Sequence, residues 1–102
     1  MRALFRRRPA VPAPEAIRYR AAPNVVSAVQ GERAVLLDAR RGRYFGVDEV
    51  GSAIWEALWR GATMPEIVDG LQQSYAAPRA QLEHDVTDFL ALLWRRKLVE
   101  AA

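Results

Sequence analysis

The sequence predicts an α+β fold in which a small three-stranded antiparallel sheet is followed by three helices. Short runs of β-branched and aromatic residues, separated by turn residues, occupy the first half of the segment after residue 22. Apolar residues at helical spacing occupy the second half. With 102 residues the chain is long enough for one domain with a single modest core. Strands first and helices after is an order typical of the α+β class.

Three strands are expected before residue 48. The runs that predict them are residues 25–29, 34–37 and 43–47. The first strand ends at the turn Gln30-Gly31-Glu32, and Asp38 closes the second. Gly42 stands just before the third strand and can take the positive φ that a tight turn requires. The second and third strands therefore form a hairpin.

Each of the three expected helices has a recognisable start. Asp48 stands at the N-cap position of the first helix, and Gly61 ends that helix. The segment Thr63-Met64-Pro65-Glu66 is a capping box that opens the second helix. Pro78 begins the third helix, which extends to Lys97 with basic residues in its last turn. Three short helices with a small sheet indicate a winged helix-turn-helix-like arrangement, a fold that does not by itself decide function.

The expected core combines a stripe on the third helix with two tryptophans of the first. The stripe consists of Leu82, Val86, Leu90 and Leu93. Trp55 and Trp59 are also expected to pack in the core, because large aromatic residues are usually well buried. Trp94 lies off the stripe, which leaves open whether it contacts a partner or packs against another helix.

Charge is unevenly distributed along the chain. Residues 1–20 hold six arginines and one acid, whereas the remainder has nine basic and eleven acidic residues, a net charge of −2. Pro9, Pro12 and Pro14 interrupt helix and sheet in the basic segment. We therefore expect residues 1–22 to be a disordered basic arm rich in proline and alanine, and residues 23–102 to form the domain.

The residue types needed for catalysis or metal binding are scarce. The chain has no cysteine and a single histidine, His84, so thiolate and multi-histidine sites are excluded. Asp85 and Asp88 share a helix face, which an acid–base pair would use, but such a pair is more often a solvated surface. No apolar run approaches the roughly 20 residues that cross a bilayer, and the first residues lack the apolar stretch of a signal peptide. We expect a cytoplasmic protein that is not an enzyme and holds no cofactor or metal.

Three motifs, taken in order, resemble one family. They are LLD-x-x-x-G-x-Y-F-G-V-D-E-V-G-S-A-I-W from residue 36, EIVDGL from residue 66 and DVTDFLALLWRRKLVE from residue 85. Together they resemble the PqqD-like family of RiPP recognition elements, which bind the leader segment of ribosomally made precursor peptides. The likeness is greatest to the free-standing leader-binding protein of lasso-peptide pathways, and it covers roughly residues 25–100. The chain departs from the family at Ala76-Ala77-Pro78, where relatives often carry a polar cap.

The resemblance implies a non-catalytic function. The leader would add as a strand to the third strand, in a cleft bordered by the third helix, and would be presented to a separate leader peptidase and to the cyclase. Lasso leaders carry a Tyr-x-x-Pro pattern, so an aromatic side chain and a proline of the leader are expected to bind in the cleft. Neither nucleic acid nor a membrane is expected as a partner. The residues expected to bind the peptide lie on the third strand and on one flank of the third helix: Arg43, Tyr44, Phe45, Gly46, Val47, Asp85, Phe89, Leu92 and Arg96. Simple core burial is the alternative role for Phe89.

Strand addition makes a prediction by parity, because successive residues direct their backbone N–H and C=O groups to opposite sides of a strand. A two-residue loop, or a three-residue loop with a bulge at Gly42, bonds Arg43 and Phe45 to the second strand. Tyr44 and Gly46 then direct their amides to the open edge. A four-residue loop is expected to reverse this assignment.

A winged-helix DNA-binding regulator that uses the basic arm is the alternative from another functional class. Against it, the third helix carries Glu83, Asp85 and Asp88, and acids that face phosphates weaken DNA binding. A small enzyme, the third class, has no candidate catalytic residues in this sequence.

Overall fold

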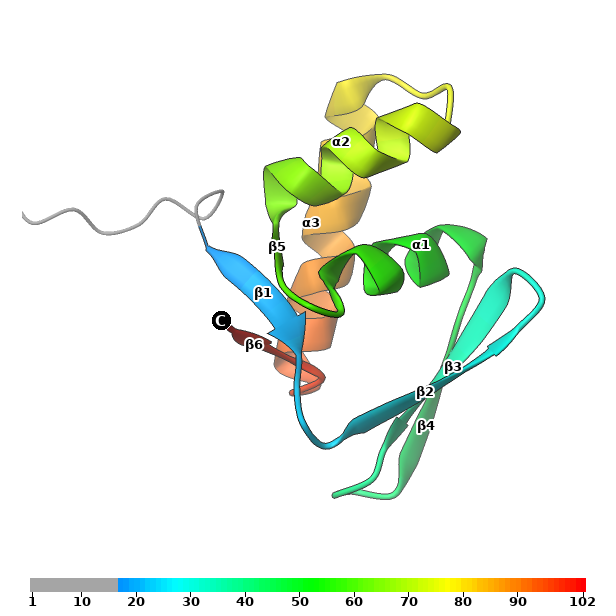
Figure 1. The fold of residues 1–102 in the computed structure, drawn as a ribbon, viewed down its shortest axis with the longest axis vertical. Coiled ribbons are helices and arrows are strands. Elements are labelled where there is room, and N and C mark those ends of the chain that lie inside the picture. Colours follow the sequence, from blue (N-terminus) through cyan, green and yellow to red (C-terminus); the bar gives the residue numbers. More distant parts are fainter. Residues whose placement is uncertain (1–16) are drawn as a thin grey trace, which may run out of the picture.

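A computed structural model gives the fold and describes residues 17–102. This part of the chain forms six strands and three helices (Figure 1). In chain order they are β1 (Arg18–Ala21), β2 (Val25–Gln30), β3 (Arg33–Asp38), β4 (Arg43–Val47), α1 (Glu49–Leu58), β5 (Ala62–Thr63), α2 (Met64–Ser74), α3 (Arg79–Arg95) and β6 (Val99–Ala101). The expected α+β class, with three helices after a three-stranded sheet, is confirmed.

The expected sheet has the antiparallel order β2-β3-β4. Gly31, with a φ of +64°, stands in the short turn between β2 and β3. The loop between β3 and β4 comprises residues 39–42, since Asp38 pairs with Arg43 across it. Gly42 has a φ of +66° and donates its N–H to the Asp38 carbonyl at 2.7 Å, so glycine supplies the left-handed residue at the end of the loop.

A second sheet, with the order β5-β1-β6, is a feature that the sequence analysis missed. Its central strand β1 falls within residues 1–22, so the prediction that this whole segment is a disordered arm is wrong at its C-terminal end. The physical reason is alternation, because Tyr19 and Ala21 face the core while the two arginines of β1 are exposed. The other part of the predicted arm, residues 1–16, lies outside the described residues.

Contacts from neighbouring elements fix β1 in place. The Arg20 guanidinium pairs with the Glu100 carboxylate of β6 at 2.7 Å. Tyr19 packs edge to face against Trp94 of α3, with ring centroids 6.2 Å apart. Trp94 therefore has a packing role, although it is 52% exposed.

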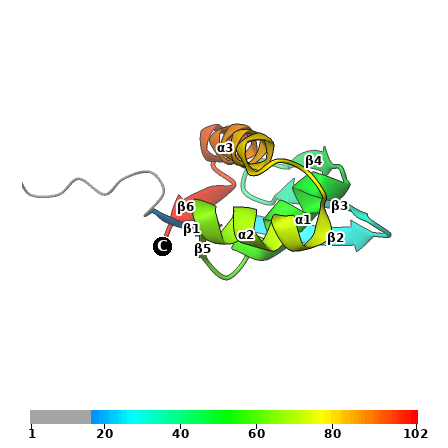
Figure 2. The same ribbon diagram turned by 90° about the horizontal axis from the view of Figure 1, so that it is seen from above.

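The helices pack against both sheets. In both views β1 and β6 lie towards one end of the molecule and the β2–β3 turn towards the other (Figures 1 and 2). Helix α1 contacts strands of each sheet, and Trp55 on it is only 3% exposed, as predicted. The expected stripe on α3 is also buried: Leu82, Val86, Leu90 and Leu93. The prediction for Trp59 is wrong, because this residue caps the C-terminal end of α1 and is 44% exposed.

The local start signals of the helices are confirmed. The Asp48 side chain caps α1, and Thr63 and Glu66 form the reciprocal capping box of α2. Helix α3 begins after Pro78 without a side-chain cap. It ends at Arg95, two residues before the expected end at Lys97. Lys97 is a non-glycine residue with a φ of +60°, and this left-handed residue turns the chain towards β6.

Candidate functional site

The outer edge of β4 is the first feature of the site. β4 is the last strand in the order β2-β3-β4, and no other strand among residues 17–102 pairs with its outer edge. Phe45 and Val47 are half-buried and pack against the core, whereas Tyr44 is 71% exposed. A strand with one face on the core and one unpaired backbone edge is a template for another extended chain.

Hydrogen bonds at the loop end of β3 set the direction of the β4 amides. The Ala39 N–H donates to the Asn24 carbonyl at 2.8 Å, so the backbone groups of Ala39 face β2. Because these groups alternate along a strand, those of Asp38 face β4, where Asp38 pairs with Arg43. The pair that closes the β3–β4 loop is therefore a hydrogen-bonded pair.

The alternation continues along β4 from Arg43. The backbone N–H and C=O groups of Phe45 and Val47 point the same way as those of Arg43 and bond to β3. Those of Tyr44 and Gly46 point to the open edge. This is the predicted assignment, although the loop has four residues. The prediction that such a loop reverses the assignment is wrong, because the closing pair is itself hydrogen-bonded.

A cleft of about 460 Å³ reaches this edge at Gly46. Strand β4 also contributes Val47, and α3 contributes Asp85 and Phe89. The remaining wall comes from the start of α1 and its cap: Asp48, Val50, Gly51 and Ile54. An extended chain on the β4 edge therefore has a cavity beside it for side chains.

Gly51 allows α3 to approach the start of α1. A Cβ at this position would lie 3.3 Å from the Val47 Cβ and 3.4 Å from the Phe89 Cζ. Phe89 is half-buried, packs against the core and also lines the cleft. Both roles considered for Phe89, core packing and cleft wall, therefore apply to it.

Opposite charges lie at the two ends of the β4 edge, beside the cleft and within it. At one end the guanidinium groups of Arg96 and Arg43 lie 5.1 and 5.8 Å from the centroid of the Phe45 ring, within cation–π range. Asp48 and Asp85 line the cleft itself. A helix rises about 1.5 Å per residue, so Asp85 and Arg96 are separated by roughly 16 Å along α3, close to the length of β4. A chain bound along β4 would meet a positive end and a negative end.

Asp38 fixes the loop that precedes β4, and its side chain is fully buried. Its Oδ1 accepts from the Asn24 side-chain amide at 2.9 Å and from the N–H groups of Arg40 and Arg41 at 3.1 Å. Its Oδ2 accepts from the Arg41 guanidinium at 3.2 Å. Burial raises the pKa of this carboxyl, but the hydrogen bonds outweigh burial and lower the pKa from 3.8 to about 2.

The structure brings most of the predicted peptide-binding residues together. Those that line the cleft are Gly46, Val47, Asp85 and Phe89. Those that gather beside it are Arg43, Phe45 and Arg96. The Tyr44 side chain is exposed, and Leu92, which is 37% exposed, does not line the cleft.

Four cleft residues escaped the sequence analysis: Asp48, Val50, Gly51 and Ile54. Asp48 was expected only as the cap of α1, a role that it fills, and Val50 and Ile54 also pack in or against the core. The position of Gly51, one turn after a helix-capping Asp48, was the one local sign of a close approach.

Comparison with known proteins decides the family. The family model described as coenzyme PQQ synthesis protein D (PqqD) matches residues 33–99. The chain belongs to the PqqD family. No curated protein matches it.

Two solved structures resemble this PqqD-family protein. TbiB1, solved in complex with the TbiA(beta) leader peptide, is 41% identical, with a TM-score of 0.75 over 79% of this chain and 94% of that chain. A lasso peptide synthetase B1 complexed with the leader peptide is 23% identical, with a TM-score of 0.72 over 80% of this chain and 96% of that chain. The second likeness supports the fold alone.

Two features are absent from residues 17–102. No group of three or more His, Cys, Asp or Glu residues in this part of the PqqD-family chain is arranged to hold a metal ion. In the same part of the chain, every helix is too short or too polar to cross a membrane. The chemistry that the cleft does offer is backbone hydrogen bonding, apolar contact and charge.

Proposed function

We propose that this PqqD-family protein binds the leader segment of a ribosomally synthesised precursor peptide as an added strand on β4. It delivers that leader to a separate peptidase, and to the cyclase, of a lasso-peptide pathway. The observation that carries the proposal is the open β4 edge beside a cleft, in a chain 41% identical to a protein solved with a leader peptide. The activity is binding without catalysis, and it raises the concentration of the leader at the processing enzyme.

Backbone hydrogen bonds supply the sequence-independent part of the affinity. The N–H and C=O groups of Tyr44 and Gly46 face the open edge, so an added strand bonds to these two residues. The space beside Gly46 is open, because a Cβ built on this residue would meet no atom of the described chain within 4 Å. The incoming strand finds no side chain in its way at this position.

Side-chain contacts supply the selectivity. Phe89 and Val47 offer apolar walls in the cleft, which suit an aromatic or proline side chain of the leader. Asp85 in the cleft and Arg96 over the Phe45 ring fix the polarity of the bound peptide. Charges at the two ends discriminate between the two directions in which a strand can add.

The DNA-binding alternative has less support. Glu83 and Asp88 are exposed on α3, with side-chain exposures of 47% and 69%, and both would repel phosphates in a major groove. A recognition helix needs the opposite charge on its exposed face.

Fluorescence anisotropy with labelled leader peptides tests the proposal. One probe is the TbiA(beta) leader. The second is the leader of a short precursor, if the reading frames next to the gene for this protein encode one. We expect at least one leader to bind the full chain with a Kd on the order of micromolar or tighter, about −8 kcal/mol or better. Labelled duplex DNA, titrated in parallel, is expected to bind at least tenfold more weakly. DNA binding with a steep salt dependence, together with no binding of either leader, would refute the proposal.

A further inference from the structure

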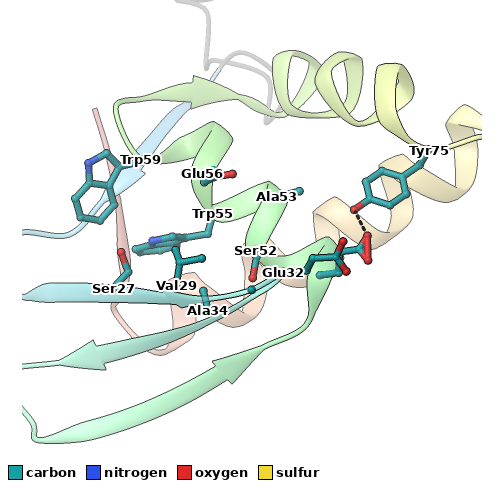
Figure 3. A pocket seen from close by; sticks show the side chains of 12 residues that line it. Ser27, Val29, Glu32, Ala34, Ser52, Ala53, Trp55, Glu56, Trp59 and Tyr75 are labelled. Atoms are coloured by element: carbon teal, nitrogen blue, oxygen red, sulfur yellow. Dashed lines mark hydrogen bonds between the residues drawn. The ribbon is translucent and has the colours of Figure 1, made fainter.

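A second cavity, of about 570 Å³, lies between α1 and the β2–β3 hairpin (Figure 3). We call it the α1 pocket. Its walls come chiefly from α1, β2 and the β2–β3 turn, and no residue of β4 or α3 contributes. β2 and β4 are the two opposite edges of one sheet. A peptide on the β4 edge therefore leaves the α1 pocket open, so the two sites can be filled at the same time.

One wall of the α1 pocket is aromatic and apolar. Trp55 and Trp59 pack edge to face with ring centroids 5.8 Å apart, and the Trp55 indole lies over Val29 (Figure 3). Trp59 is 44% exposed and Val29 is 66% exposed. An exposed tryptophan face attracts cations, and the apolar surface beside it suits the aliphatic stem of a long side chain.

The α1 pocket also carries negative charge. Glu32, Glu49 and Glu56 line it, and no arginine, lysine or histidine does. Within residues 17–102 none of these three carboxylates takes part in an ion pair. The Tyr75 hydroxyl donates to Glu49 at 3.3 Å, and burial together with the charges of Glu49 and Glu32 raises the pKa of Tyr75. The pocket thus holds negative charge that the described part of the chain does not neutralise.

The wall also contains polar atoms without a partner. The Trp55 indole N–H and the Ser52 hydroxyl are buried and make no hydrogen bond among residues 17–102. Trp55 as a whole is only 3% exposed. Buried donors in folded proteins are almost always paired, so an unpaired one at a pocket wall is consistent with an acceptor that arrives with a ligand.

We infer that the α1 pocket is a second docking site, which takes an arginine side chain presented by a partner protein while the β4 edge is occupied. Charge complementarity carries the inference, because Glu56 lies one helical turn from the exposed Trp59 and two further carboxylates, those of Glu32 and Glu49, line the same pocket. A guanidinium group can stack on Trp59 and bond to Glu56, one helical turn before it, at the same time. Glu49 stands ten residues before Trp59, roughly 15 Å along α1, and adds negative charge at the other end of the pocket. A backbone carbonyl of the same segment supplies an acceptor for the Trp55 N–H. The site stands independently of leader binding, since it shares no residue with the β4 cleft.

Nuclear magnetic resonance on the ¹⁵N-labelled full chain tests this site. The probe is acetyl-hexa-arginine amide, with acetyl-hexa-glutamate amide as the negative control. The three tryptophan indole N–H signals show where the peptide binds, since Trp55 and Trp59 line the pocket and Trp94 does not. We expect hexa-arginine to shift the signals of Trp55 and Trp59, to leave that of Trp94 unchanged, and to bind more weakly as salt rises.

Two double variants distinguish specific binding in the α1 pocket from general attraction of hexa-arginine to acidic surface. Glu49→Gln with Glu56→Gln is expected to lower hexa-arginine affinity at least tenfold. Glu83→Gln with Asp88→Asn, which removes two acids from the exposed surface of α3, is expected to leave that affinity unchanged. Equal affinity in the two double variants, or shifts confined to Trp94, would overturn the inference.

Two further measurements identify the occupant. If a variant with Arg6→Gln, Arg7→Gln and Arg8→Gln shifts the Trp55 and Trp59 signals without peptide and tightens hexa-arginine binding, the chain's own segment fills the pocket. That outcome would overturn the assignment to a partner, whereas unchanged signals support it. Leader affinity is then measured with and without hexa-arginine and is expected to be the same. Failure of leader binding alone would refute the proposed function and leave the α1 pocket standing.

Discussion

The two sheets contain strands that begin alike and have opposite roles. β1 begins Arg18-Tyr19 and β4 begins Arg43-Tyr44. β1 is the central strand of its sheet and is paired on both sides, by β5 and β6, whereas β4 is an edge strand. Tyr19 packs on the core, but Tyr44 is 71% exposed. The place of a strand in its sheet, more than its composition, decides whether it holds the fold together or offers an edge for binding.

The largest expected effect is the removal of the central strand. Deletion of residues 2–21 takes away β1, the one strand that joins β5 to β6, and the Tyr19 contact with Trp94. We expect this variant to be unfolded, with loss of the near-ultraviolet circular dichroism signal. Deletion of residues 2–16 is the matched control, and we expect its thermal midpoint to stay within a few degrees of the full chain. A folded protein without β1 would show that the smaller sheet is dispensable.

The next effect concerns the helix that contacts both sheets. Trp55→Ala is expected to destabilise the protein by about 3–5 kcal/mol in a denaturant melt, since a 3% exposed indole leaves a large cavity. Trp59→Ala is the comparison, because Trp59 is 44% exposed and its loss should cost less than about 1.5 kcal/mol. Similar costs for the two substitutions would contradict the distinction drawn between them.

Proline substitutions at neighbouring positions test the difference between β4 and β1 directly. In β4, Phe45→Pro removes a bond to β3 and is expected to cost about 3 kcal/mol or more. Gly46→Pro loses only an edge amide, so the protein should stay folded while leader affinity falls at least about tenfold, or 1.4 kcal/mol. Gly46→Ala keeps the N–H and has room for its Cβ, so it is expected to bind leader normally.

In β1 the two sides of the strand are both paired, so neighbouring prolines should act alike. The Ala102 N–H donates to the Arg18 carbonyl at 2.7 Å, which directs Arg20 to β6 and Tyr19 to β5. We expect Tyr19→Pro and Arg20→Pro each to lower the thermal midpoint.

The two β4 variants decide the binding mechanism. If the Phe45→Pro and Gly46→Pro proteins both folded and bound leader normally, strand addition to the β4 edge would not be the mechanism.

The smallest effect is a difference in pH dependence between the sheets. The folded-state pKa of Asp38 is about 2, below the ordinary value of 3.8, so its contribution to stability is complete above pH 3.8 and is lost as the pH falls towards 2. Asp38→Asn should therefore lower the free energy of unfolding at neutral pH. In urea melts, the difference in unfolding free energy between this variant and the natural protein should narrow from pH 4 to pH 2. A difference that stays constant over this range would contradict the lowered pKa of Asp38.

Glu66, on α2 and bonded to Arg18 of the other sheet, provides the comparison. Its pKa is lowered by the N–H of Thr63 and by the Arg18 guanidinium, but its side chain is 53% exposed. Solvent screening weakens such exposed pairs. Glu66→Gln is therefore expected to change the pH dependence of stability less than Asp38→Asn does.

Local signals predicted the elements whose ends are fixed within a few residues. Asp48 and the capping box at Thr63 mark helix starts through bonds that span three residues, so the sequence shows both partners together. The four-residue loop before β4 was not evident, because Asp38 closes it through a buried side chain that bonds to Asn24. The choice between a two-residue and a four-residue loop depends on that distant partner.

Non-local pairing explains what the sequence analysis missed. The alternation in Arg18–Ala21 is a strand signal, but β1 becomes ordered only by pairing with β5 and β6, which lie far along the chain. In the cleft, too, some residues have a local sequence signal and others depend on contacts between distant elements. Helical spacing placed Asp85 and Phe89 on one flank of α3, whereas the part played by Gly51 depends on how closely α1 meets α3.

The pairing of β1 with β6 has a consequence for the order of folding. Arg20 and Glu100, which face each other across it, are 80 residues apart in the chain. Closing so long a loop costs entropy that the β2–β3 and β3–β4 hairpins, with turns of a few residues, do not incur. The hairpin sheet that offers the binding edge is therefore expected to form early, and the β1–β6 pair to close last. During synthesis on a ribosome, that last step must wait until Glu100 has left the exit tunnel.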